Sequence, residues 1–394
     1  MKKAILSLGV FMLLLALAVG PVFADEAINK DTGLNSNNYA ITAEVDFDVV
    51  YNDNEAKLCN FTFVGANTGF NRISGDGDDN SLGTGSAGAV ANISNFQNTN
   101  VSVIEGEDGD SELVAKNIDT GEGSENWAVA ADVDAAIVWN KNNARLCNFT
   151  FAIANSGFNR IGGNPCDQCG GDGDKNSIRT GAASAEANTI NVQNTNLSMI
   201  SVGGSDGSIS AMNKETGKKS DNYAIAANVD AAAVVNLNDA RAMNSTVALA
   251  NSGFNGISGD DENSITAGTA LANANTTNLQ NTNVAVVEQG GSDGSIDASN
   301  KDTSGCSENV AVGADVEVAV VVNDNDAKLG NATVAGANSG GNVVSGDDNN
   351  SISTGAASAT ADTTNVQNTN VTVIGGGSCL FPDLCEPQCG ATCN

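Results

Sequence analysis

Two acidic loops place carboxylate or amide oxygens at alternate positions, a spacing typical of calcium-binding loops. Their oxygen-bearing residues are Asp76, Asp78, Asn80, Asp172, Asp174 and Asn176. A hard cation prefers a shell of several oxygens, which such loops supply. No glutamate stands at the spacing of an EF-hand, so a solvated acidic turn is the competing interpretation. The sequence predicts Ca2+ as a possible bound ion and no other cofactor.

Cysteine is the second residue type that could do chemistry, and the chain contains nine. Four follow a glycine run near the C-terminus and predict a disulfide knot, with a four-thiolate zinc site as the alternative. Two more lie in an insertion and predict a loop staple or a link to another chain. These six candidates are Cys166, Cys169, Cys379, Cys385, Cys389 and Cys393.

The chain has no histidine, which excludes several catalytic classes. Serine or cysteine nucleophiles activated by histidine and histidine-ligated zinc cannot form. Carboxylate chemistry on a β-helix survives this test, and a polysaccharide-cleaving enzyme with its cleft at the insertion is a remote alternative. We therefore expect a protein that is not an enzyme.

Four near copies of one unit must position these residues. The tetrad Gln-Asn-Thr-Asn ends at Asn100, Asn196, Asn283 and Asn370, at spacings of 96, 87 and 87 residues. A fixed period of this kind is the signature of a repeat architecture. The predicted organisation is a signal peptide (1–24), repeat 1 (25–117), repeat 2 (118–213) with an insertion at 162–171, repeat 3 (214–300), repeat 4 (301–374) and a cysteine-rich tail (375–394).

Each repeat opens with a strictly alternating stretch, residues 39–49 in the first copy, which predicts a strand. Ile41 and Phe47 fall on one face and Glu44 and Asp46 on the other, so we expect the apolar face to pack inward and the acidic face to meet water. A turn at 52–55, rich in Asn and Asp, and a second strand at 58–63 are expected next. Gly, Asn and Thr interrupt the Ala-containing stretches, so the chain is expected to be all-β.

An elongated β-solenoid built from the four repeats is the favoured architecture, with four β-sandwich domains in tandem as the alternative. Roughly 22 residues per coil would give about four coils per repeat and a rod about 80 Å long. On this geometry Cys59 and Cys147 would lie about 19 Å apart, too far for a disulfide. We therefore expect them to be buried thiols or to bond with a second subunit.

The N-terminus predicts export. Lys2 and Lys3 precede an apolar stretch over residues 4–19, and small or apolar residues at 22–24 suit a signal peptidase, with an uncleaved anchor as the alternative. No later stretch is apolar for the length of a membrane span. A formal net charge of -30 makes nucleic acid an unsuitable partner. A secreted or cell-surface location is expected.

The tetrads at Gln97, Gln193, Gln280 and Gln367, with the abundant Asn, Gly and Thr, give the repeats a recognisable style. They resemble tandem-repeat proteins of prokaryotic cell surfaces and, more distantly, curlin-type fibre subunits. The resemblance implies a structural or adhesive protein of a surface layer, fibre or matrix, whose partners are other copies, cell-surface components or glycans. A calcium-dependent carbohydrate- or surface-binding protein is the alternative function.

Overall fold

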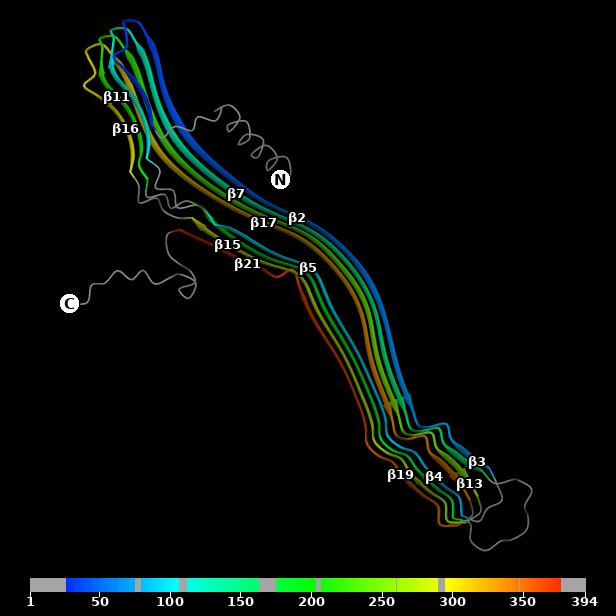
Figure 1. The fold of residues 1–394 in the computed structure, drawn as a ribbon. Coiled ribbons are helices and arrows are strands. Elements are labelled where there is room, and N and C mark those ends of the chain that lie inside the picture. Colours follow the sequence, from blue (N-terminus) through cyan, green and yellow to red (C-terminus); the bar gives the residue numbers. More distant parts are fainter. Residues whose placement is uncertain are drawn as a thin grey trace, which may run out of the picture.

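The structure is a computed structural model that describes residues 26–74, 79–105, 112–162, 175–202, 207–259, 261–289, 295–346 and 348–376. Within these ranges the regular structure is entirely β, in strands that run along the length of the molecule (Figure 1). None of the described residues belongs to a helix long and apolar enough to cross a bilayer. The predicted signal peptide and the cysteine-rich tail beyond Gly376 lie outside the described residues.

Each repeat contributes one set of strands, here called a rung. Rung 1 holds β1 (Glu26–Lys30), β2 (Asn37–Asn67), β3 (Arg72–Ser74), β4 (Ser81–Gly83) and β5 (Ala87–Glu105). Rung 2 holds β6 (Leu113–Thr120), β7 (Glu125–Asn155), β8 (Arg160–Gly162), β9 (Ser177–Arg179) and β10 (Ala183–Val202). Rung 3 holds β11 (Ile209–Thr216), β12 (Asp221–Asn251), β13 (Gly256–Ser258), β14 (Ser264–Thr266) and β15 (Ala270–Gln289). Rung 4 holds β16 (Ile296–Lys301), β17 (Glu308–Asn338), β18 (Val343–Ser345), β19 (Ser351–Ser353), β20 (Ala357–Gln367) and β21 (Asn370–Gly376).

Every strand pairs in parallel with its counterpart in the neighbouring repeat. The sheet orders are β17-β12-β7-β2, β20-β15-β10-β5 with β21 beside β15, β1-β6-β11-β16, β18-β13-β8-β3 and β19-β14-β9-β4. The register is continuous, since all 31 residues of β2 face their equivalents in β7. The β-solenoid of four repeats is confirmed, and tandem sandwiches are excluded because a sandwich pairs its strands within one domain.

The expected coil length was wrong. One repeat forms a single rung, in which β2 runs about 100 Å in one direction and β5 and β6 return along it. Four rungs make a stack only about 19 Å high, so the long dimension follows the strands instead of the stack. Period-two alternation marks strands but carries no information about whether a strand pairs within its own repeat or with the next one.

The two layers meet through small side chains. Inward-facing alanines of β5, β10 and β15 pack on alanines of β7 and β12, and a second alanine cluster joins β6 and β11 to the start of the long strands. Larger residues, including Ile104, Val138 and Ile200, fill the middle. At the far end, Ile161, Ile178, Ile257 and Ile265 of the short strands pack together and close the coil. Small residues let the layers approach closely, which is why aromatic residues are scarce inside.

One local prediction was wrong, and the tetrad adds a feature that the alternation did not predict. The expected turn at 52–55 lies inside β2, because Asn52 and Asn54 point inward and are hydrogen-bonded there. In the tetrad, Asn98 adopts a left-handed backbone with φ of 53°. The buried positions of β5 are odd-numbered before Asn98 and even-numbered after it. The tetrad therefore acts like a β-bulge that changes which residues of the strand face inward. Asn tolerates the left-handed backbone that this requires.

The expected orientation of the first strand is reversed. Ala40 and Thr42 face the interior, so Glu44 and Asp46, at the same parity, lie on the inner side of β2. The apolar residues at odd positions face outward, where Phe47 is 55% exposed. Alternation establishes that a strand has two different faces, but only the packing of the second layer decides which one is inside.

Candidate assembly surfaces

The predicted calcium ligands are only partly visible. Asn80 donates through Nδ2 to Oδ1 of Asn176 at 3.0 Å, and Asn176 donates likewise to Asn263 at 3.0 Å. Both therefore lie in a column of amides. The four predicted carboxylate ligands lie outside the described residues. They are Asp76, Asp78, Asp172 and Asp174. In the described ranges, no group of three or more acidic, cysteine or histidine side chains is arranged to hold a metal. The calcium hypothesis stays a prediction.

The cysteine predictions divide in the same way. The six disulfide candidates of the insertion and tail lie outside the described residues. Cys59 and Cys147 are register partners in adjacent strands, so the expected separation of about 19 Å was wrong because one repeat spans one rung. Both are free thiols and Cys59 is exposed, so it is not buried as expected. A hydrogen bond with Cys59 is the main cause that raises the pKa of Cys147. Bonding to a second subunit stays a prediction.

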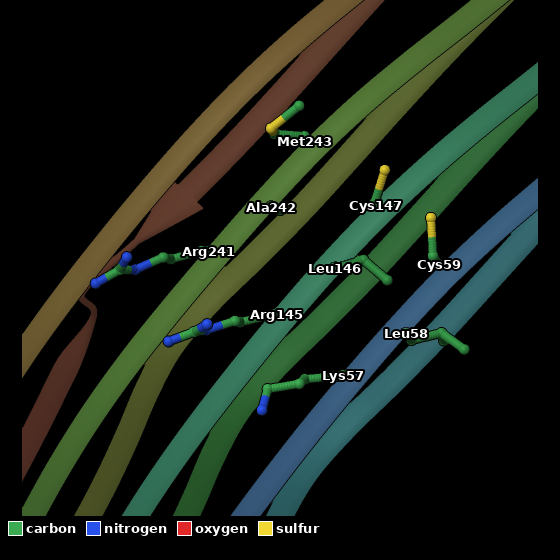
Figure 2. A pocket seen from close by; sticks show the side chains of 9 residues that line it. All are labelled: Lys57, Leu58, Cys59, Arg145, Leu146, Cys147, Arg241, Ala242 and Met243. Atoms are coloured by element: carbon green, nitrogen blue, oxygen red, sulfur yellow. The ribbon is translucent and has the colours of Figure 1, made fainter.

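Figure 2 shows these sulfurs in line with Met243 on the outer surface of the long-strand sheet, beside a shallow pocket. Lys57, Arg145 and Arg241 line its other side, and Lys328 follows them in register. Lys57 pairs with Glu55 at 2.7 Å and Lys328 with Asp326 at 3.1 Å, and both pairs are exposed. Exposed pairs of this kind contribute little to stability, so this column of cations marks a solvated band of the sheet.

Ladders of asparagine run through the stack from rung to rung. At each position, an amide Nδ2 donates to the Oδ1 of the equivalent residue in the adjacent rung, over distances of 2.7 to 3.3 Å. The ladders start at Asn29, Asn38, Asn52, Asn54, Asn60, Asn67, Asn71, Asn80, Asn95, Asn98 and Asn100. A parallel glutamine ladder joins Gln97, Gln193, Gln280 and Gln367. The tetrads therefore form stacked amide columns.

Paired ladders also join the two layers. Asn142 of β7 donates to Asn196 of β10 at 2.8 Å, and Asn148 donates to Asn191 at 2.8 Å. Each buried amide thus bonds along its column and across the coil. The cost of burying so many polar groups is met because they are almost all hydrogen-bonded. Equal Asn positions in every repeat were the sequence signal for this network.

The two ends of the stack are open edges in the part of the chain that the structure describes. β2 and β17 end the order of their sheet, and β5 and β20 end theirs. A neighbouring rung on each side buries a strand more deeply. In the inner strand β12 buried and half-buried residues alternate, whereas most of the edge strand β17 is exposed. Unpaired strand edges offer a row of backbone donors and acceptors to another strand.

Glycines show how close one rung lies to the next. A methyl group on Gly157 would collide with the backbone of Gly253, and one on Gly253 with that of Gly340. The last member of this column, Gly340, faces open space. A second column points the other way, and there Gly85 of rung 1 faces open space. Each open edge therefore has a glycine that faces open space, whereas the equivalent glycines of the other rungs lie against the backbone of a neighbouring rung.

Inward-facing carboxylates form two neighbouring columns in the long-strand sheet. Asp132 stands over Glu44, and Asp134 lies between Asp46 and Asp230. Burial, followed by the charge of Glu44, raises the pKa of Asp132 to about 6. Burial, followed by the charge of Asp132, raises the pKa of Asp134 to about 7. Burial also raises the pKa of Asp230.

Stability should fall as the pH rises through this range. The folded chain holds protons on Asp132 and Asp134 up to about pH 6 and 7, whereas the same groups in the unfolded chain release them near 3.8. From pH 5 to pH 8 the folded state therefore loses stability, by on the order of 3 kcal/mol. Chemical denaturation at both pH values measures this change. The double variant Asp132→Asn, Asp134→Asn should reduce the difference, and an unchanged difference would contradict the assignment.

In comparison with known proteins, the chain matches no family model, no curated protein and no solved structure. Function is therefore argued from the stack itself.

Proposed function

We propose that this chain is a non-enzymatic structural protein of the cell exterior whose copies stack end to end into fibres, with rung 4 of one copy on rung 1 of the next. The observation that carries the proposal is the pair of open edges on a stack of four near-identical rungs. Translation of the molecule along the stack continues every strand, amide column and glycine column. Export is the prediction of the N-terminal sequence.

The amide columns support one direction of stacking. In the column that begins at Asn100, every Nδ2 donates toward rung 4, so Asn100 presents an Oδ1 with no ladder donor. At the opposite edge, Asn370 has no further rung to donate to among the described residues. A second copy placed rung 4 to rung 1 pairs these two groups. A copy placed head to head would bring equivalent groups together and would break the parallel register.

The edge glycines give the test. Gly340→Ala and Gly85→Ala add a methyl group in open space in one molecule, but in a stack each would meet the backbone of the next copy, as at the inner rungs. Neither glycine has a positive φ, so alanine fits the backbone. We expect both variants to fold normally. Fibre growth should fall by at least about tenfold, because in a stack the added methyl group would lie far closer to the backbone of the next copy than an ordinary van der Waals distance.

The control is Gly88→Ala, also in rung 1. Its register partners are Ser184 and Leu271, so a side chain at this position is compatible with neighbouring rungs. Electron microscopy of the full chain is the measurement. An equimolar mixture of the two blocked variants should give pairs but no fibres. Absence of wild-type fibres, or fibres from both blocked variants, would refute the proposal.

A further inference from the structure

The long-strand sheet exposes a continuous apolar surface on its outer side, here called the outer face. It comprises the outward positions of residues 39–51 and their register partners, seven positions in each of four strands. All are apolar or aromatic and none is charged, although 16% of the chain is charged. Its members are Tyr39, Ile41, Ala43, Val45, Phe47, Val49, Tyr51, Trp127, Val129, Ala131, Val133, Ala135, Ile137, Trp139, Tyr223, Ile225, Ala227, Val229, Ala231, Ala233, Val235, Val310, Val312, Ala314, Val316, Val318, Val320 and Val322.

This surface has no partner among the described residues, since both return layers pack on the opposite side of the sheet. Tyr51 is 60% exposed and Phe47 is 55% exposed. Thirteen residues along the strand and four strands across give about 43 Å by about 19 Å, or roughly 800 Å2. Soluble monomers rarely expose an apolar patch of that size. Roughly 800 Å2 per partner is also what a standard stable interface buries.

The shape of the outer face points to a second copy of this chain as its occupant. One column contains only alanine (Ala43, Ala131, Ala227 and Ala314), and the next contains only valine (Val45, Val133, Val229 and Val316). We propose that two copies pair outer face to outer face about a two-fold axis parallel to the stack, passing between these columns. The valines of each copy then lie against the alanines of the other.

In rung 3 the same axis also matches large with small side chains. It places Tyr223 against Ala233 and Ile225 against Ala231. The next outward column begins with Asp53 and Lys141, which lie outside the face. Their side chains form an ion pair at 2.8 Å. Under this axis the columns from Tyr39 to Val49 meet each other, and the column that begins at Tyr51 lies at the rim, against the polar column that begins at Asn37. A net charge of -30 makes an anionic lipid surface a poor competitor for this face. Face pairing uses a different surface from edge stacking and does not rest on the proposed function.

The test uses the full chain carrying Gly340→Ala, which blocks edge stacking and leaves the outer face alone. Sedimentation velocity at tens of micromolar should give the mass of two chains of 39.7 kDa. Val229→Glu should raise the dimer dissociation constant by at least about 100-fold, because a carboxylate would be buried against alanine. Leu237→Glu, an equivalent change on the outer side of β12 but outside the face, should leave the dimer intact.

Ala227→Leu separates specific pairing from general stickiness. It enlarges the apolar surface, yet it occupies the space that Val229 of the other copy needs, so the dissociation constant should rise about tenfold. Circular dichroism checks that each variant is folded. A monomeric parent protein would overturn the proposal, as would tighter dimers from Ala227→Leu. Binding of a monomeric parent to phosphatidylcholine vesicles would assign the face to lipid instead.

Discussion

Gly157→Ala should destabilise the folded protein by more than about 4 kcal/mol, the largest effect we expect from adding one methyl group. Gly157 is buried where the long strand β7 ends and the coil turns toward β8. A Cβ there would overlap the carbonyl oxygen of Gly253 and would also approach its amide nitrogen. The nearest obstacle is the backbone of the next rung, so no rotamer change relieves it. The rungs would have to separate, with loss of the hydrogen bonds that flank this position.

Gly340→Ala is the matched control, since it is the same position of the same column in rung 4. Nothing lies within 4 Å of the methyl group it adds. Its free energy of unfolding should change by less than about 0.5 kcal/mol, as for ordinary surface substitutions. Urea titration followed by circular dichroism measures both variants. Equal stability of the two would mean that the rungs do not lie as closely as the structure has them.

Asn196→Leu should lower the free energy of unfolding by about 4 kcal/mol. The Asn196 side chain is fully buried and makes four amide hydrogen bonds. It accepts from Asn100 at 2.9 Å and Asn142 at 2.8 Å, and it donates to Asn238 at 3.1 Å and Asn283 at 2.8 Å. Leucine removes all four and leaves buried donors and acceptors with fewer partners, each at about 1–3 kcal/mol.

Asn188→Leu on the same strand provides the comparison. Asn188 also lies in a ladder, bonding to Asn92 at 3.0 Å, but this ladder runs along the outer side of β10. Water can replace the lost bonds there, so the expected loss is below about 1 kcal/mol. Denaturant midpoints distinguish the two cases. A similar loss for both variants would show that burial of the amide network is not the source of stability.

The buried network also fixes how the strands align. A shift of one rung by a single residue would replace inward amides by outward side chains along the whole length of the strand. Asn142 and Asn196 would then lose partners both along the stack and across the layers. The repeats can therefore be nearly identical and still stack in one register.

Much of the architecture could be predicted from the chain alone. The period of 87 to 96 residues and the alternation at 39–49 were enough for an all-β solenoid of four repeats. Identical Asn positions, as at Asn100 and Asn196, carry the sequence signal of the stacked amides. These features are local or repeat exactly along the sequence, so no knowledge of distant packing is needed to find them.

Other features depend on contacts that the sequence does not encode locally. A segment such as 52–55 has the composition of a turn, but it becomes strand because Asn140 and Asn142 in the neighbouring rung bond its amides. For the same reason Cys59 and Cys147 became neighbours when each repeat proved to be one rung. The sequence by itself determined the β-solenoid class, the repeat count and the amide columns. Only the tertiary structure decided the length of the coil and which face of the long strands is buried, because both depend on pairing across nearly ninety residues.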